Sequence, residues 1–302
     1  MKPTIIDCDP GIDDALALLL AAGSPELGLL AVTTVAGNRP APITARNARK
    51  ILDLAGRVAV PVHAGAERPL MGGDARCNLV HGEDGLGGVP LDEPGAIAAG
   101  HAAVALVDIL RQHSPASIDL VAMGPLTNLA LAELLSPGIL RRAGRLAIMG
   151  GALRVPGNIT PAAEFNFYAD PLAADIVMRS GAPITLFALD VTHQAIMSGP
   201  WIASFSDLDS RSGRAAAAML QAYAAMDPLL HDVCPVAYLL REQLFSLEAC
   251  RVEVDFRAGP DEGKALAHFG VAAGPGPVLQ AATGVDNPAL LALVLERIAT
   301  LP

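Results

Sequence analysis

The chain has 302 residues, of which 52 % are hydrophobic and 17 % charged, a balance typical of a compact α/β protein and unlike a disordered or coiled-coil chain. The net charge is −10 and the 21 basic residues form no run, which argues against a nucleic-acid-binding surface. No apolar run approaches the roughly 18 residues of a membrane span, and the N-terminus does not resemble a signal peptide. We therefore expect no membrane association and a cytoplasmic location.

The cysteines indicate the same compartment. Cys8, Cys77, Cys234 and Cys250 lie far apart and form no CxxC pair. This spacing predicts neither a zinc site nor a disulfide framework. A reducing environment is therefore expected.

The predicted elements alternate along the chain. Residues 3–8 and 27–35 are predicted strands that flank a helix over 13–22, which makes one βαβ unit. Further strands are predicted over 58–65, 117–124, 145–151 and 183–191, and further helices over 101–112, 126–135 and 170–180. This order predicts an α/β fold with a Rossmann-like, mostly parallel central sheet flanked by helices, in a single domain spanning 1–302.

Two predicted loops are long and rich in polar residues and glycine. They span residues 66–95 and 153–168, and each follows a predicted strand. Ligand sites of α/β sheets lie at the carboxyl ends of strands. Both loops are therefore expected to carry functional residues.

Four aspartates crowd the first strand-to-helix turn, within DCDPGIDD. Strand periodicity places Asp7 and Asp9 on one side, and the Pro-Gly turn brings Asp13 and Asp14 to the start of the next helix. Taken singly, such acids serve equally well as turn residues or as partners of the helix dipole. Four together repel one another, and a hard divalent cation relieves that repulsion most simply. Calcium is favoured because it accepts several carboxylate and carbonyl oxygens, with magnesium as the alternative.

With its flanking helix, this segment reads DCDPGIDDALALLLA and closely resembles the N-terminal signature of the nucleoside hydrolases, the inosine-uridine-preferring family. Further segments resemble the same family: VTTVAGN, HGEDGLGG, PLTN, GNITPAAEFNFYADP and the His231-Asp232 pair. The resemblance runs from residue 4 to about residue 300. It implies a homodimer or homotetramer that acts on a small ribonucleoside in purine or pyrimidine salvage or catabolism.

The resemblance also implies a role for each matching residue. One Ca²⁺ per subunit would be held by the side chains of Asp9, Asp14 and Asp232 and by the main-chain carbonyl of Thr127. The residues implied at the substrate are Asp13, Asn38, His81, Met149, Asn158, Glu164 and Asn166. Amide and carboxylate side chains complement ribose hydroxyls, which both donate and accept. We expect Glu164 and Asn166 to share one face of an extended stretch.

The expected reaction is hydrolysis of the N-glycosidic bond, which gives free ribose and base through an oxocarbenium-like sugar. Asp9 would act as general base toward a water that the metal acidifies. His231, assisted by His81 or Tyr223, would protonate the departing base. We expect pyrimidine ribonucleosides or a broad set as substrates.

Departures from the family concern the base-binding side. Val233-Cys234-Pro235 follows the His-Asp pair where the family commonly has proline at once, which could alter the start of the next helix. The resemblance is weak over 198–230, and Trp201 does not match the stacking tryptophan of the purine-specific branch. Tyr223 lies eight residues before His231 and could reach the base, but it is better explained as a core residue.

The sequence also bears on three other functions. A sensor would bind nucleoside or ribose without turnover, which the presence of both Asp9 and His231 disfavours. A magnesium-dependent phosphatase with a DxD motif would use Asp7 as nucleophile, but Gly11 stands where it needs Thr or Val, and lysine is almost absent. A dinucleotide-binding dehydrogenase needs GxGxxG where this chain has acids.

Overall fold

The computed structural model describes residues 1–78, 80–270 and 276–302. In these residues, nine strands form one sheet in the order β3-β2-β1-β4-β5-β6-β9-β7-β8. They are β1 (Lys2–Cys8), β2 (Leu27–Thr34), β3 (Val62–Ala64), β4 (Asp119–Ala122), β5 (Arg145–Met149), β6 (Ile184–Phe187), β7 (Phe245–Val254), β8 (Ala265–Phe269) and β9 (Leu279–Val285). Strands β1 to β6 and β9 pair in parallel, and β7 runs antiparallel to β8 and β9. The predicted, mostly parallel α/β sheet is confirmed.

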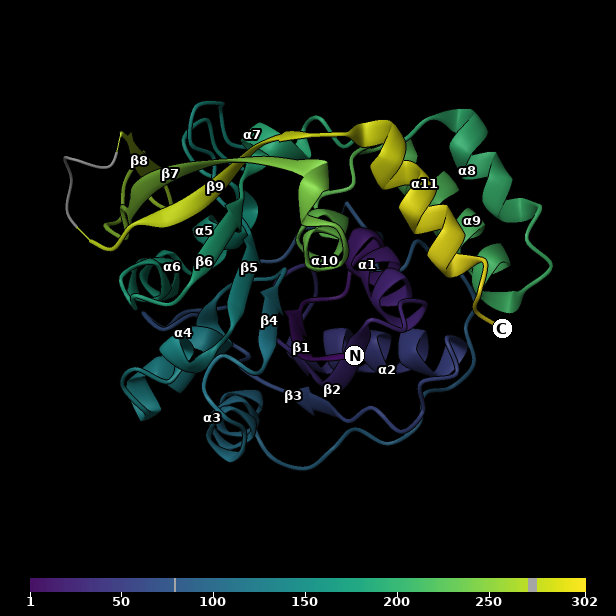
Figure 1. Ribbon diagram of the computed structural model, residues 1–302, viewed down its shortest axis with the longest axis horizontal. Coiled ribbons are helices and arrows are strands. Elements are labelled where there is room, and N and C mark those ends of the chain that lie inside the picture. The colour runs from purple at the N-terminus through teal and green to yellow at the C-terminus, as the bar shows by residue number, and fades with distance from the viewer. Residues whose placement is uncertain (79, 271–275) are drawn as a thin grey trace.

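Helices cover both faces of the sheet (Figure 1). One face carries α1 (Ile12–Ala22), α2 (Ala41–Leu54), α8 (Gly199–Ser206), α9 (Arg211–Ala224), α10 (Val233–Leu240) and α11 (Asn287–Ile298). The other carries α3 (Ala102–Gln112), α4 (Thr127–Leu135) and α6 (Pro171–Met178). Alternate residues of β1 face opposite ways, so Ile6 packs into the first core and Ile5 into the second. The central strands are therefore apolar on both faces.

The first βαβ unit agrees with its prediction to within one residue at each end, because β1, α1 and β2 carry clear periodicities. The four other predicted strands are shorter than expected, including 117–124, of which Asp119–Ala122 pairs, and 145–151, of which Arg145–Met149 pairs. Only Val62–Ala64 of 58–65 pairs, at the sheet edge, while the guanidinium of Arg49 binds the carbonyls of Arg57 and Val60 ahead of it. The apolar run 183–191 divides into β6 and the short helix α7 (Leu189–Thr192).

The two loops also differ from one another. The described residues of 66–95 contain no helix or strand, as expected, and Leu79 lies outside the described residues. The segment 153–168 instead ends in a short helix, α5 (Phe165–Ala169). Among the described helices, none combines the length and apolar character needed to cross a membrane.

Candidate active site

The carboxyl ends of neighbouring strands place the first site residues together. Strands β2, β1, β4 and β5 are adjacent and parallel. Asp9 follows β1, Asn38 follows β2, Met123 follows β4 and Met149 ends β5. Parallel strands end at one edge of a sheet, so segments far apart in sequence converge there.

Asp9 is buried at this edge, between two glycines. Its Oδ2 accepts from the backbone N–H of Asn38 at 2.6 Å, and its Oδ1 has no partner. A Cβ on Gly124 would lie 2.5 Å from that Oδ1, and one on Gly37 would overlap Oδ2. The missing side chains of these glycines therefore make the space that the carboxylate occupies.

Asp14 fixes the turn between β1 and α1. Its Oδ1 accepts from the backbone N–H of Asp9 at 3.2 Å, and its Oδ2 accepts from that of Gly11 at 2.9 Å. The Asn38 amide adds a bond of 3.2 Å to Oδ2. These donors orient the carboxylate at the start of α1, where the helix dipole also favours negative charge.

Asp232, from a distant part of the chain, lies close to the aspartates of the first turn. Asp232 directly precedes α10, and Asp13, Asp14 and Asp232 each offer a carboxylate oxygen within 4.8 Å of the others. We call these three residues the acidic cluster. All three are buried, and Asp13 Oδ1 has no hydrogen-bond partner.

The energetics of these acids fit a bound cation. Burial, followed by repulsion from Asp14, raises the pKa of Asp9 well above its usual value. Burial, followed by repulsion from Asp13, likewise raises the pKa of Asp14 to about 6 and that of Asp232 well above its usual range. Burial raises the pKa of Asp13 to about 6. Such carboxylates resist ionisation unless a cation offsets their charge, and hard oxygen donors suit calcium or magnesium.

A hollow of about 430 Å³ opens above the acidic cluster. Among the residues predicted from the sequence, its wall contains Asp13, Asn38, His81, Met149, Asn158, Glu164, Asn166, Tyr223, His231 and Asp232. Asp9, Asp14 and Thr127 are buried but do not line it. We call this hollow the acidic cavity.

One wall is made by α5 and the loop before it. Glu164 caps α5, where its carboxylate accepts from the N–H groups of Asn166 and Phe167 and from Gly151. The Asn166 amide donates to the carbonyl of Met123 at 2.6 Å. The expected extended stretch is wrong, because this capping turns residues 165–169 into a helix. Glu164 and Asn166 nevertheless line the same cavity.

The opposite wall carries aromatic and imidazole rings. His81 stacks on Tyr223 with centroids 5.0 Å apart, and its Nδ1 accepts from the backbone N–H of Ile12. That bond leaves the hydrogen of a neutral ring on Nε2, which lies 3.7 Å from Asp13 Oδ1. Burial lowers the pKa of His81 to about 4, so this ring is neutral at physiological pH.

His231 is held from both sides. Its Nδ1 lies 2.8 Å from Thr192 Oγ1, and its Nε2 lies 3.2 Å from Asp227 Oδ2. Burial acts to lower the pKa of His231, but the bond to Asp227 and the nearby charges, chiefly that of Asp13, outweigh it and raise the pKa. The two imidazoles of the cavity therefore differ, since the pKa of His81 is lowered and that of His231 is raised.

Thr127 begins α4, and its hydroxyl donates to Asp170 at 2.7 Å. Helix α10 begins directly after Asp232, with Pro235 in its first turn. Trp201 lies outside the cavity wall, where it packs against Phe205 and donates to the carbonyl of Leu291.

Sequence reasoning missed five residues of the cavity wall: Asn78, Val80, Met123, Phe165 and Asp227. Asn78 precedes His81 by three residues in the same loop, and its amide donates to Asn38 Oδ1 at 2.9 Å. Asp227 precedes His231 by four residues, and that spacing is the one signal that pointed to it.

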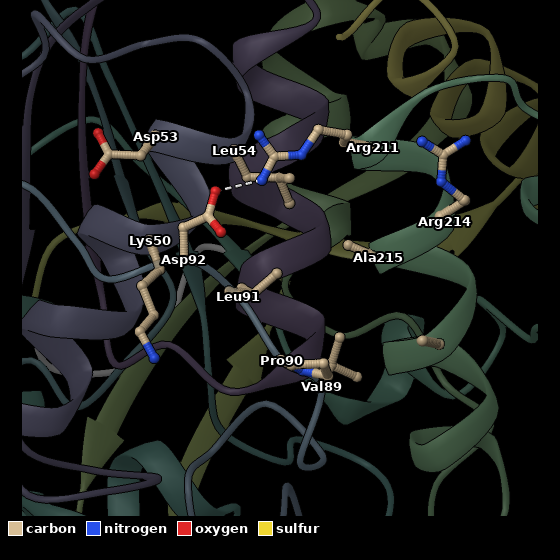
Figure 2. Close-up of a pocket in the computed structure, with 11 residues that line it drawn as sticks. Lys50, Asp53, Leu54, Val89, Pro90, Leu91, Asp92, Arg211, Arg214 and Ala215 are labelled. Carbon is tan, nitrogen blue, oxygen red and sulfur yellow. Dashed lines mark hydrogen bonds and ion pairs between the residues drawn. The ribbon is translucent and has the colours of Figure 1, made fainter.

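A larger hollow of about 870 Å³ lies elsewhere, between α2, residues 89–92 and α9 (Figure 2). Arg211 and Asp92 pair there at 2.5 Å, and both are exposed. Asp53 is taken up by Arg49 at 2.9 Å. None of the acidic cluster lines this hollow, so size alone does not identify the active site.

Known proteins of one family resemble this chain in sequence and in structure. Residues 4–292 match the family model described as inosine-uridine preferring nucleoside hydrolase. The chain is 36 % identical to the inosine-uridine preferring nucleoside hydrolase of Crithidia fasciculata, over 89 % of this chain and 88 % of that protein. It is 38 % identical to the pyrimidine-specific ribonucleoside hydrolase RihA of Enterobacter sp., over 98 % and 97 %. The solved purine-preferring ribonucleoside hydrolase of Gardnerella vaginalis superposes with a TM-score of 0.92 at 32 % identity, covering 99 % and 98 % of the chains.

Proposed function

Because the chain belongs to the inosine-uridine preferring nucleoside hydrolase family and is a ribonucleoside hydrolase, we propose that it is calcium-dependent and acts on pyrimidine or a broad set of ribonucleosides. The observation that carries the proposal is the acidic cluster at the floor of a cavity whose walls hold amides, carboxylates and imidazoles. A phosphatase fits poorly, because Asp7 accepts from Thr33 and Asn128 and does not line the cavity.

The proposed metal ligands are Asp9, Asp14, Asp232 and the carbonyl of Thr127, with Asp13 beside them. A calcium ion held by these residues would offset their charge and would supply Lewis-acid activation of a water. Three of these carboxylates approach one another and have raised pKa values, which supports the proposal.

Asp9 is the proposed general base. The Oδ1 of this buried carboxylate is unpartnered, while a backbone N–H fixes Oδ2. A proton can therefore be accepted at Oδ1 once a bound cation keeps this carboxylate ionised.

Ribose binding is assigned to Asp13, Asn38, Asn158, Glu164 and Asn166, with Met149 at the strand end beneath them. Several are already held by the backbone: Asn158 accepts from the N–H of Phe165, and Glu164 accepts three backbone bonds. Groups held in this way keep their orientation when a sugar binds, which makes positioning effective.

The leaving base is assigned to the wall of His81, Tyr223 and His231. His231 is the proposed proton donor because its pKa is raised, whereas His81 is neutral and offers hydrogen bonding alone. The wall contains no tryptophan, since Trp201 lies elsewhere. This supports a pyrimidine-preferring or broad enzyme.

The test is a panel of uridine, cytidine, inosine, adenosine and thymidine, with release of reducing sugar as the measurement. Release from the ribonucleosides, with the pyrimidines at least as fast as the purines, is the expected result. A purine-only pattern would contradict the specificity proposed. Binding of all five without release would favour a sensor.

Light scattering on the same sample tests the homodimer or homotetramer implied by the family resemblance.

A further inference from the structure

Both ring nitrogens of His231 are occupied, and they face different surroundings. Nδ1 meets the hydroxyl of Thr192, which is fully buried. Nε2 meets Asp227, whose side chain is 28 % exposed and lines the acidic cavity. The nitrogen turned toward the cavity is therefore Nε2.

The backbone holds Asp227 in this place. Its N–H donates to the carbonyl of Tyr223 at 2.9 Å, which fixes it to the end of α9. The residues after it are tied to the chain beyond α7: Met197 donates to the carbonyl of Pro228, and Leu230 donates to that of Ala195. The carboxylate is thus presented to His231 by a segment anchored at several points.

In the contact between Asp227 and His231, only the ring nitrogen can be the donor when the carboxylate is ionised. An ionised carboxylate only accepts hydrogen bonds, so its bond to Nε2 requires a hydrogen on that nitrogen. The Thr192 hydroxyl can donate or accept, so it suits either state of Nδ1. Carboxylates orient catalytic imidazoles by the same principle in hydrolases that use an acid, a histidine and a nucleophile.

We propose that Asp227 is a positioning residue that holds the His231 ring with its Nε2–H toward the cavity, so that the ring, when it carries a hydrogen on both nitrogens, gives the Nε2 proton to a departing base and becomes neutral. The proposal rests on the proposed role of His231 as proton donor. Asp227 acts through His231, so its effect must depend on the need of the leaving base for a proton.

The experiment compares Asp227→Ala, His231→Ala, the double variant and Asp227→Asn. The control is Asp209→Ala, an exposed acid just before α9. Turnover is measured on uridine, inosine and p-nitrophenyl riboside, whose leaving group needs no proton. We expect Asp227→Ala to lower kcat on the nucleosides by about 10- to 100-fold, within the range of general acid catalysis. On p-nitrophenyl riboside the change should stay below about 3-fold, KM should change little, and Asp227→Asn should recover part of the loss.

In the His231→Ala background, removal of Asp227 should add less than about a further 2-fold loss, since coupled residues are not additive. Equal losses on both kinds of substrate would overturn the proposal, as would a change confined to KM, which would make Asp227 a base-binding residue. Long-range ¹H–¹⁵N spectra of the imidazole rings give a readout that needs no substrate, with His231 assigned from the His231→Ala spectrum. We expect a hydrogen on Nε2 in the wild type. A wild type without ribose release would refute the proposed function, whereas an Nε2 without hydrogen would refute this inference.

Discussion

The site depends on single residues whose surroundings change their chemistry. Asp7 and Asp9 are two residues apart, yet they do different things. Asp7 accepts from Thr33 at 2.5 Å and from Asn128 at 2.8 Å and so ties β1 to β2 and to the start of α4, while Asp9 keeps an unpartnered oxygen. Both residues are aspartates, and they differ in whether a carboxylate oxygen is still free to accept a hydrogen bond.

Removing the Asp9 carboxylate tests its role directly. Asp9→Ala should lower kcat by at least about 10²- to 10⁴-fold, because the general base is lost along with a proposed metal ligand. The thermal midpoint of unfolding of Asp9→Ala should be close to that of the wild type, because the substitution also removes the repulsion between Asp9 and the neighbouring acids. Asp53→Ala, which removes an acid paired with Arg49 away from the cavity, is the matched control and should keep full activity. Near-normal turnover of Asp9→Ala would show that the base is another residue.

Sequence alone predicted most of the cavity at this scale. Signature segments carry Asp13, Asn38, His81, Glu164 and His231, and all of them line one wall or another. Asn78 was missed because it reaches the cavity through a tertiary contact with Asn38, which no local periodicity encodes, and Asp227 was missed although it lies four residues before His231. The sequence predicted Asp9 as a metal ligand beside Asp14 and Asp232, whereas the acidic cluster contains Asp13 with those two residues. The directions of the side chains at the turn before α1 decide which aspartate joins the cluster.

At the scale of the elements, the carboxyl ends of strands and the starts of helices position the side chains of the site. The βαβ units were predictable because apolar strands and amphipathic helices have distinct periods. The failures came at two short helices, of which only α5 has a side-chain cap. Glu164 turns 165–169 into α5, and the run after Phe187 bends into α7.

The glycine at the end of β4 gives a prediction at this scale. Gly124→Ala places a Cβ 2.5 Å from Asp9 Oδ1, so the carboxylate must move. We expect kcat to fall by about 10²-fold or more, since displacements near 1 Å have such costs, while circular dichroism stays unchanged. Gly199→Ala, with nothing near its Cβ, is the control. Wild-type activity in Gly124→Ala would mean that the exact place of Asp9 is unimportant.

Asp170 joins α6, α4 and the loop that contains Leu70. It caps α6 through the N–H of Ala173 and accepts from the Thr127 hydroxyl and from the N–H of Leu70. Asp170→Ala leaves these buried donors unsatisfied and should reduce the free energy of unfolding by about 2 to 4 kcal/mol. Urea unfolding measures this, with Asp170→Asn expected to lose less. A change below about 0.5 kcal/mol would show that water replaces the carboxylate.

At the scale of the whole molecule, the buried acids link stability to pH. Burial raises the pKa of Asp7 to about 7 and those of Asp13 and Asp14 to about 6, above the usual value of 3.8. Between pH 4 and 7 the folded state therefore binds more protons than the unfolded state. These groups contribute stability at low pH, and that contribution is lost as pH rises through the folded-state pKa values.

We therefore expect the thermal midpoint in chelator to be several degrees higher at pH 5 than at pH 7.5. Saturating calcium should raise the midpoint more at pH 7.5, because cations bind ionised carboxylates. Differential scanning calorimetry at the two pH values, with and without calcium, measures both effects. An equal calcium shift at the two pH values would contradict the linkage.

The central claim is that this ribonucleoside hydrolase works through a cation held by the acids at the carboxyl edge of its sheet. The most direct measurement follows ribose release from uridine and inosine by protein stripped with chelator, then supplied with calcium or magnesium, alongside calorimetric counting of bound metal. The account predicts no release after stripping, recovery with calcium at one ion per chain, and no recovery in Asp14→Ala. Full release from protein shown to be free of metal would contradict it.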